Sequence, residues 1–155
     1  MSLDRFLRLG ETVILGTHSF DPEEIKVFAR KFDPQPFHTD EEAARHSLLG
    51  GLCASGWHTC AMWMKYNLIA QEEELRQPWP GPEPKPEFGP SPGFSDLKWP
   101  KPVYAGDEIT FTRCATGYRQ LSSRPGWKIL TLQSGARNQH GDAVLSMTNA
   151  VLLKA

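Results

Sequence analysis

The run CASGWHTCAMWMKYNLIAQEEEL, residues 53–75, has the longest helical periodicity in the sequence. Apolar side chains recur through it at the spacing of one helix face: Cys53, Trp57, Cys60, Ala61, Met64 and Leu68. The alanine, serine and glycine near its start predict a close approach by another part of the backbone. We therefore expect one long, mostly buried helix at the centre of the fold.

Strand-forming sequences lie on both sides of this helix. Four later runs are separated by turn sequences: Phe94–Trp99, Glu108–Thr116, Trp127–Ala136 and Ala143–Leu153. Residues 11–17 are also β-branched and apolar. Because short turns join the last three runs, these strands must be antiparallel. The sequence thus predicts an α+β fold with an antiparallel sheet of about five strands around the long helix.

A shorter helix is predicted between the first strand and the long helix. Ser19 or Asp21 is suited to cap it, and Pro22 is suited to its first turn. Ile25, Phe28, Ala29 and Phe32 then form a stripe that is expected to be buried. The helix must end before Pro34, which places Asp33 just beyond its last turn. A second short helix is expected from Thr39 or Asp40.

The connecting sequence Phe32-Asp33-Pro34-Gln35-Pro36-Phe37-His38-Thr39-Asp40 holds an acid and an imidazole five positions apart. Proline fixes its own φ and favours an extended residue before it, so the segment from Asp33 to His38 is expected to be extended and stiff. A carboxylate and a neutral imidazole held in this way can share a water molecule and transfer its protons. The alternative is an ordinary loop with an exposed acid and histidine.

Length and composition restrict the class of protein. A chain of 155 residues predicts a single domain, residues 1–155, and the net charge of −1 gives no electrostatic basis for binding nucleic acid or an anionic membrane. The N-terminus lacks the apolar core of a signal peptide, which predicts a cytoplasmic protein. The cysteines, Cys53, Cys60 and Cys114, are expected to be reduced packing residues.

Residues 77–93 contain seven of the thirteen prolines in the chain. A segment of this composition cannot form a helix or an inner strand, and extended structure is expected. We interpret it as a loop that crosses the fold or covers a site.

The Asp33–His38 segment, followed by Glu42-Ala43-Ala44, Gly50-Gly51 and Ala54-Ser55-Gly56, resembles the MaoC-like dehydratase family, which includes the (R)-specific enoyl-CoA hydratases. The later sequence Pro102-Val103-Tyr104-Ala105-Gly106-Asp107 is similar to a corner of the same family. The resemblance extends from about Phe20 to the C-terminus. It implies a hot-dog fold and a role in fatty acid metabolism: hydration of a 2-enoyl thioester or the reverse dehydration, with CoA as the expected carrier. It also implies a homodimer or a higher homo-oligomer.

The resemblance also implies roles for individual residues. Asp33 and His38 match the catalytic pair of the family, and the backbone N–H of Gly56 matches its donor to the thioester oxygen. Gln35 stands where the family has asparagine, and Ser55 stands where it has histidine before the glycine. Gln35, Ser55, Trp57 and His58 are the candidate residues for a substrate pocket. No cofactor is expected, and no pair of histidines has the context of a zinc site.

Other interpretations remain open. The first is a hot-dog acyl-CoA thioesterase, although residues 53–70 lack the acidic residue that one such class carries on its central helix. The second is a non-catalytic subunit that pairs with another hot-dog protein, or a binding module that presents the proline-rich loop. Among the remaining histidines, we expect His58 to pack in the interior rather than face the cleft, and His18 and His46 to be exposed.

Overall fold

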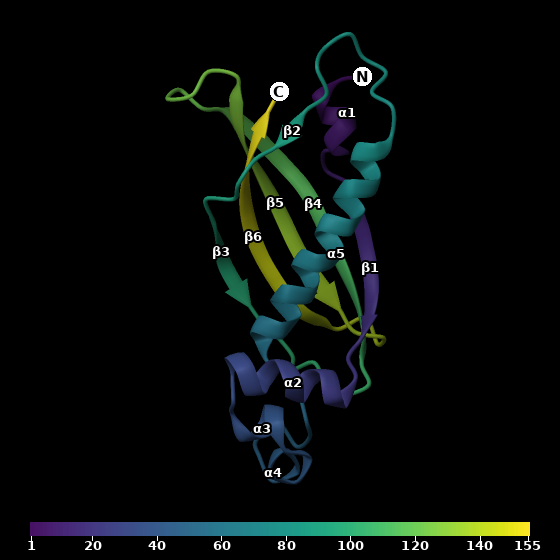
Figure 1. Cartoon of the computed structure of the whole chain (residues 1–155), viewed down its shortest axis with the longest axis vertical. Helices are drawn as coiled ribbons and strands as arrows, with labels where there is room; N and C mark the ends of the chain where they lie inside the picture. Colours follow the sequence, from purple (N-terminus) through teal and green to yellow (C-terminus); the bar gives the residue numbers. More distant parts are fainter.

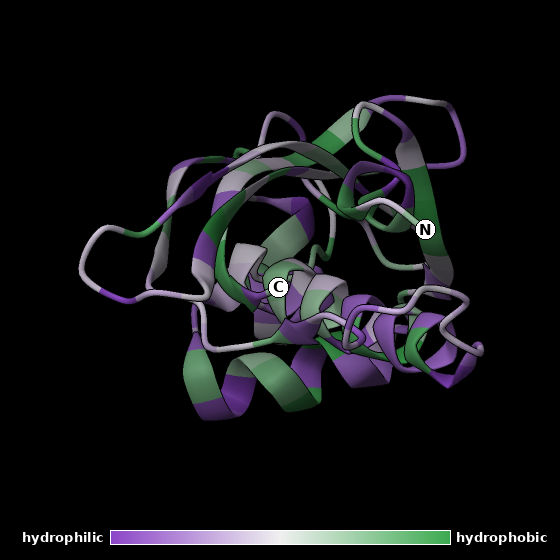
Figure 2. Ribbon diagram, turned by 90° about the horizontal axis from the view of Figure 1, so that it is seen from above, coloured by the Kyte–Doolittle hydropathy of each residue, from purple (hydrophilic) through white to green (hydrophobic).

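The computed structural model describes residues 1–155 and consists of a curled antiparallel sheet with a long helix, α5, along its concave face (Figures 1 and 2). The strand order is β1-β4-β5-β6-β2, and β3 also pairs with β6. The strands are β1 (Thr12–Ser19), β2 (Glu87–Phe88), β3 (Gly93–Lys98), β4 (Glu108–Gln120), β5 (Trp127–Arg137) and β6 (Ala143–Lys154). The predicted strands and their antiparallel order are confirmed, and the two-residue β2 is added to them.

Helix α5 (Gly56–Arg76) begins three residues later than predicted. Cys53 forms an isolated antiparallel bridge with Tyr104, which keeps the backbone extended up to the helix. Ser55 is the N-cap, and its Oγ accepts a hydrogen bond from the Trp57 N–H at 3.3 Å. Neither α5 nor any other helix combines the length and the apolar character needed to cross a membrane.

The orientation of α5 differs from the prediction. Trp57, Met64 and Leu68 of the apolar stripe are 50%, 45% and 53% exposed, so the expectation of a mostly buried helix with this stripe in the core is wrong. The buried face carries His58, Thr59, Trp63 and Asn67 instead. The periodicity predicted an apolar stripe on α5, but a different face of the helix meets the sheet. Hydrogen bonds hold this face in place: Trp63 Nε1 donates to the Thr112 carbonyl, and Asn67 Oδ1 accepts from Arg113.

The principal core lies between α5, the sheet and α2 (Pro22–Phe32). Its largest fully buried side chains include Phe20, Ile25, Ile109 and Phe111. Burial of each such side chain contributes about 1.5–3 kcal/mol to stability. This core therefore fixes α2, and with it the residue that follows α2, against the sheet.

The segment between α2 and α5 contains two further helical turns, α3 (Pro36–Thr39) and α4 (Glu41–Arg45). Asp21 caps α2 and Asp40 caps α4, as expected, by accepting hydrogen bonds from backbone N–H groups. The segment from Asp33 to His38 is not extended throughout, because Pro36 occupies the first position of a helical turn, where its fixed φ suits the helix. His38 consequently lies on a helical turn rather than on an extended loop.

The proline-rich segment 77–93 returns from the end of α5 to the edge of the sheet, near α1 (Leu3–Leu7) and both termini (Figure 1). Only β2 is regular within it until β3 begins at Gly93, as its proline content predicted. Lys85 Nζ donates to the carbonyls of Leu75 and Gln77, which satisfies carbonyl groups at the C-terminal end of α5.

Candidate active site

The carboxylate of Asp33 lies at the junction of α2 and α5. Asp33 is the C-cap of α2, and its Oδ2 accepts a hydrogen bond from Ser55 Oγ at 2.7 Å. Its Oδ1 accepts one from Gln35 Nε2 at 2.7 Å. Burial acts to raise the pKa of Asp33, but these hydrogen bonds and the nearby His38 outweigh it and hold the pKa below its usual range. Asp33 is therefore an oriented carboxylate at neutral pH.

The imidazole of His38 faces this carboxylate and is nearly buried. Nδ1 lies 2.6 Å from the carbonyl oxygen of Cys53. Since a carbonyl only accepts, Nδ1 carries the hydrogen, and Nε2 of the neutral ring has a free lone pair. Nε2 is 3.4 Å from Asp33 Oδ2. Two acceptors thus face one another, an arrangement suited to a water molecule that donates one hydrogen to each.

The backbone N–H of Gly56 opens the first turn of α5 beside this pair. No carbonyl or side chain in the chain accepts it. An N–H group of a first helical turn also lies at the positive end of the helix dipole. A cavity of about 80 Å³ adjoins Gly56, lined in part by Thr59, Trp99 and Val103. The lining of this cavity includes neither Asp33 nor His38.

The thiol of Cys53 is also close to His38, but its chemistry is unfavourable. Sγ lies 3.6 Å from His38 Nδ1. Burial, assisted by the charge of Asp33, raises the pKa of Cys53 to about 11. Because Nδ1 is already bonded to a carbonyl, no base is available to remove the thiol proton. Cys53 is a packing residue, and its backbone rather than its side chain orients the imidazole.

Substitution Ser55→Ala is expected to move the acid limb of the pH–activity profile to higher pH. The hydroxyl of Ser55 is one of the two hydrogen-bond donors that lower the pKa of Asp33, so its removal raises that pKa and the active carboxylate is lost at a higher pH. The measurement is kcat/KM against pH for the wild type and the variant. An unchanged acid limb in a folded Ser55→Ala protein would contradict this assignment.

Comparison with known proteins places the chain in a family. The family model of the MaoC-like domain matches residues 8–77. The crystal structure of a MaoC-like dehydratase from Rhodospirillum rubrum is 37% identical, over 99% of this chain and 97% of that one, with a TM-score of 0.79. The chain belongs to the MaoC-like dehydratase family.

Two further proteins are similar to the chain, one in sequence and one in structure. YdeM, an uncharacterized protein of Bacillus subtilis, is 28% identical over an alignment of 158 positions that covers 99% of each chain. The structure of an (R)-hydratase from A. caviae involved in PHA biosynthesis is 23% identical, over 92% of this chain and 94% of that one, with a TM-score of 0.66. The hot-dog fold expected from the sequence is therefore confirmed.

The structure brings most of the predicted site residues of this MaoC-like protein together. Gln35 and Ser55 donate hydrogen bonds to Asp33, His38 Nε2 lies 3.4 Å from the same carboxylate, and Gly56 follows Ser55 directly. Trp57 lies outside this group. Its ring is half exposed and packs edge-on against Trp99, with ring centroids 5.2 Å apart.

The histidines occupy different environments. His58 is 1% exposed, and its Nε2 contacts Glu24 Oε1 at 3.2 Å, so it points into the interior beneath α2. His46 is exposed, as expected. The expectation for His18 is wrong: its side chain is only 14% exposed and contacts both Glu24 and Tyr66. Nothing in the local sequence around His18 indicates these partners, which lie on α2 and α5.

Trp99 is a neighbour of the site that the sequence did not indicate. A Cβ atom added to Gly56 would lie 2.3 Å from Trp99 Cε2, so only glycine fits beneath this indole. The predicted approach of another backbone is found just before α5, where the Ala54 N–H donates to the Val103 carbonyl, whereas at Gly56 the close neighbour is the side chain of Trp99. Its position 43 residues beyond Gly56 explains why no local pattern revealed it.

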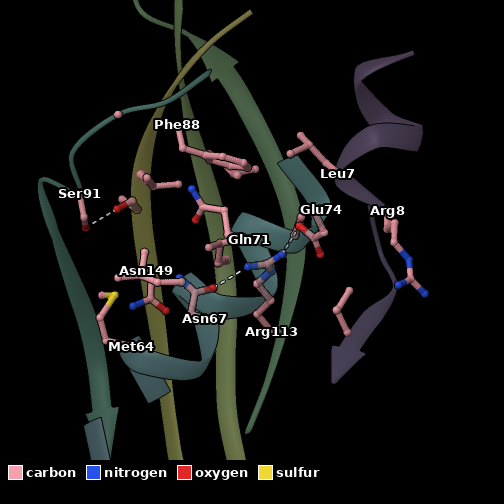
Figure 3. A pocket seen from close by; sticks show the side chains of 18 of the residues that line it. Leu7, Arg8, Met64, Asn67, Gln71, Glu74, Phe88, Ser91, Arg113 and Asn149 are labelled. Atoms are coloured by element: carbon pink, nitrogen blue, oxygen red, sulfur yellow. Dashed lines mark hydrogen bonds and ion pairs between the residues drawn. The ribbon is translucent and has the colours of Figure 1, made fainter. Parts of the chain in front are cut away.

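A larger cavity of about 360 Å³ lies between the C-terminal half of α5 and the sheet (Figure 3). Most of its lining is apolar, and Trp63, Met64 and Phe88 are among the residues that form it. Arg113 is held within it by Glu74 and by Asn67, each at 2.6 Å. The charge of Arg113 is therefore balanced, and the cavity provides an apolar space of the size of small-molecule sites.

Proposed function

We propose that this protein hydrates a 2-enoyl thioester, carried by CoA, to a 3-hydroxyacyl thioester and catalyses the reverse dehydration. The observation that carries the proposal is the Asp33–His38 pair: its carboxylate accepts a hydrogen bond from Ser55, the residue that precedes the unused N–H of Gly56. Membership in the MaoC-like dehydratase family supports the reaction class. The similarity to the (R)-hydratase from A. caviae supports a hydration reaction.

In the proposed mechanism, one water molecule lies beside Asp33 and His38 and donates a hydrogen bond to each, since their facing atoms, 3.4 Å apart, are too close to hold it between them. Asp33, with its low pKa, accepts one hydrogen bond and remains ionised, while His38 Nε2 removes a proton as the water oxygen attacks the β-carbon. The resulting imidazolium, stabilised by the Asp33 carboxylate, then delivers the proton to the α-carbon. One water is consumed, its hydroxyl on the β-carbon and its proton on the α-carbon.

The Gly56 N–H is proposed to stabilise the negative charge that develops on the thioester oxygen. The enolate is the species in which this charge is greatest, so a fixed donor accelerates the reaction more than it strengthens ground-state binding. The first helical turn supplies the donor without any reorganisation, because its N–H has no competing acceptor within the chain.

The larger cavity is the proposed site of a longer acyl chain. It begins at Trp63, two helical turns after Gly56, which is a distance on the order of 10 Å along the helix. A four-carbon acyl group bound at Gly56 is too short to occupy it, whereas a medium chain can reach it. We therefore expect 2-decenoyl-CoA to be a better substrate than crotonyl-CoA.

The deciding experiment follows the absorbance of the enoyl thioester with both substrates and, in parallel, the release of free thiol. Loss of absorbance without thiol release is the expected result. Thiol release without hydration would identify a thioesterase instead. If a folded protein catalysed neither reaction, the hydratase proposal would be rejected in favour of a non-catalytic subunit.

We also propose that the protein functions as a homodimer. The half-exposed stripe of α5 (Trp57, Met64 and Leu68) lies on the same helix as the proposed donor, and β3 is an exposed edge strand that carries the 56% exposed Phe94. Unpaired edges and exposed apolar surface favour association. A second copy would cover both features, consistent with the homodimer that the sequence implied.

Substitution Leu68→Glu is expected to dissociate this dimer, because it places a charge within the contact. A loss of about 2 kcal/mol corresponds to a dissociation constant about 30-fold higher. Sedimentation measurements over a concentration series test this. Val27→Glu changes a similarly exposed apolar residue on α2 and serves as the control. Equal dimerisation of both variants and the wild type would rule out this interface.

A further inference from the structure

Two imidazoles share one carboxylate oxygen on the side of α5 that faces β1 and α2. Glu24 Oε1 lies 2.7 Å from His18 Nε2 and 3.2 Å from His58 Nε2. His18 Nδ1 lies 3.0 Å from the hydroxyl of Tyr66. Because a carboxylate accepts, both histidines donate from Nε2, and the proposed reaction uses none of these four groups.

His58 is held in this cluster with unusual constraint. Its ring stacks on Phe28 with centroids 4.5 Å apart and planes inclined by 7°, and Phe20 packs against its edge. Its Nδ1 is buried without any partner. Burial lowers the pKa of His58, which keeps the ring neutral. A phenylalanine would fill the same space without a buried unpaired nitrogen, so packing alone does not account for a histidine here.

The contacts of α2 with the first turn of α5 come from both ends of α2. Glu24, near the start of α2, bonds to His58, the third residue of α5. Asp33, at the other end of α2, bonds to Ser55, the N-cap of α5. Two hydrogen bonds about 13 Å apart along α2 thus converge on the turn that presents the Gly56 N–H. This arrangement restrains both translation and rotation of α2 against α5.

We propose that His58, through its hydrogen bond to Glu24, is a positioning residue that sets the distance between the Asp33 carboxylate and the Gly56 N–H. It touches neither substrate nor water. The inference rests on the proposed hydration reaction for its consequence in catalysis, since proton transfer and the stabilisation of the thioester oxygen must act on one bound substrate at once. A shift of about 1 Å between such groups can cost on the order of 100-fold in rate.

The decisive variant is His58→Phe, which keeps the aromatic stack and removes the hydrogen bond. We expect a thermal midpoint equal to or above that of the wild type, a kcat lower by about 10- to 100-fold, and a KM within about threefold. Glu24→Gln retains an oxygen that accepts from both histidines and should preserve kcat, whereas Glu24→Leu should reproduce His58→Phe. Ile25→Val, on the same helix, controls for a loss of stability alone.

A second measurement does not depend on turnover. Titration of the Asp33 carboxyl by ¹³C NMR should show a higher pKa in His58→Phe than in the wild type, because displacement of α2 weakens the Ser55 hydrogen bond. The Asp33 carboxyl in Glu24→Gln should have the same pKa as in the wild type. Wild-type kcat, or an unchanged Asp33 titration, in folded His58→Phe would overturn the positioning role. An inactive wild type would reject the hydratase proposal, and the titration would still test His58.

Discussion

Asp33→Asn and His38→Ala are each expected to lower kcat/KM for enoyl-thioester hydration by about 1000-fold. Asparagine retains the size of Asp33 and can still accept from Ser55, but it has no charge to stabilise an imidazolium. Alanine at position 38 removes the only nitrogen that faces the carboxylate with a free lone pair. Initial rates of absorbance loss, measured on proteins with matched thermal midpoints, give both values.

The two effects should not add. Because the proposed steps need both groups on one water molecule, the double variant is expected to be about as slow as either single one. Cys53→Ala provides the matched control, since the Cys53 carbonyl rather than its thiol holds His38. Its kcat should remain within about threefold of the wild type. Substantial hydration by Asp33→Asn would remove the carboxylate from the mechanism.

Gly56→Ala is expected to lower kcat by about 100-fold, comparable to the loss of one donor to a developing oxyanion. The new Cβ would lie 2.3 Å from the indole of Trp99, so the first turn of α5 or the indole must move. Overpacking of this kind also costs about 1–3 kcal/mol of stability. The rate and the free energy of unfolding should therefore both fall.

A double variant separates these two effects. Gly56→Ala with Trp99→Ala should regain stability because the clash is relieved, while kcat stays low because the methyl group remains beside the N–H. Gly51→Ala is the control, because the nearest atom to its added Cβ is at 3.7 Å, an ordinary contact. Full recovery of kcat in the double variant would mean that Gly56 serves only the packing of Trp99.

Local chemistry determined which parts of the fold were predictable. The caps Asp21 and Asp40, the end of α2 before Pro34, and the alternating strands each depend on neighbouring residues, so their sequence patterns were sufficient. The half-exposed position of Trp57, Met64 and Leu68 depends on how the opposite face of α5 bonds to Thr112 and Arg113, which are remote in sequence. The prediction of an extended segment considered only the effect of proline on the preceding residue. Proline is also favoured in the first turn of a helix, and Pro36 occupies that position in α3.

The candidate site likewise has some features that the local sequence predicts and others that depend on residues remote in sequence. The sequence brought Asp33, Gln35 and His38 within one segment, and a family pattern added Ser55 and Gly56. The tautomer of His38 and the constraint imposed by Trp99 depend on Cys53 and on the end of β3, and each requires the folded chain. The shared carboxylate of Glu24 joins three elements and has no signature in any one of them.

The hydroxyl of Ser55 serves two structures at once, since it caps α5 and donates to Asp33 while being completely buried. Alanine would lose both functions, and aspartate would cap the helix but repel the neighbouring carboxylate. Threonine would retain both hydrogen bonds, but its additional methyl group would have to fit into a fully buried position. In a library of all residues at position 55 of this protein, folding and turnover should therefore both select serine.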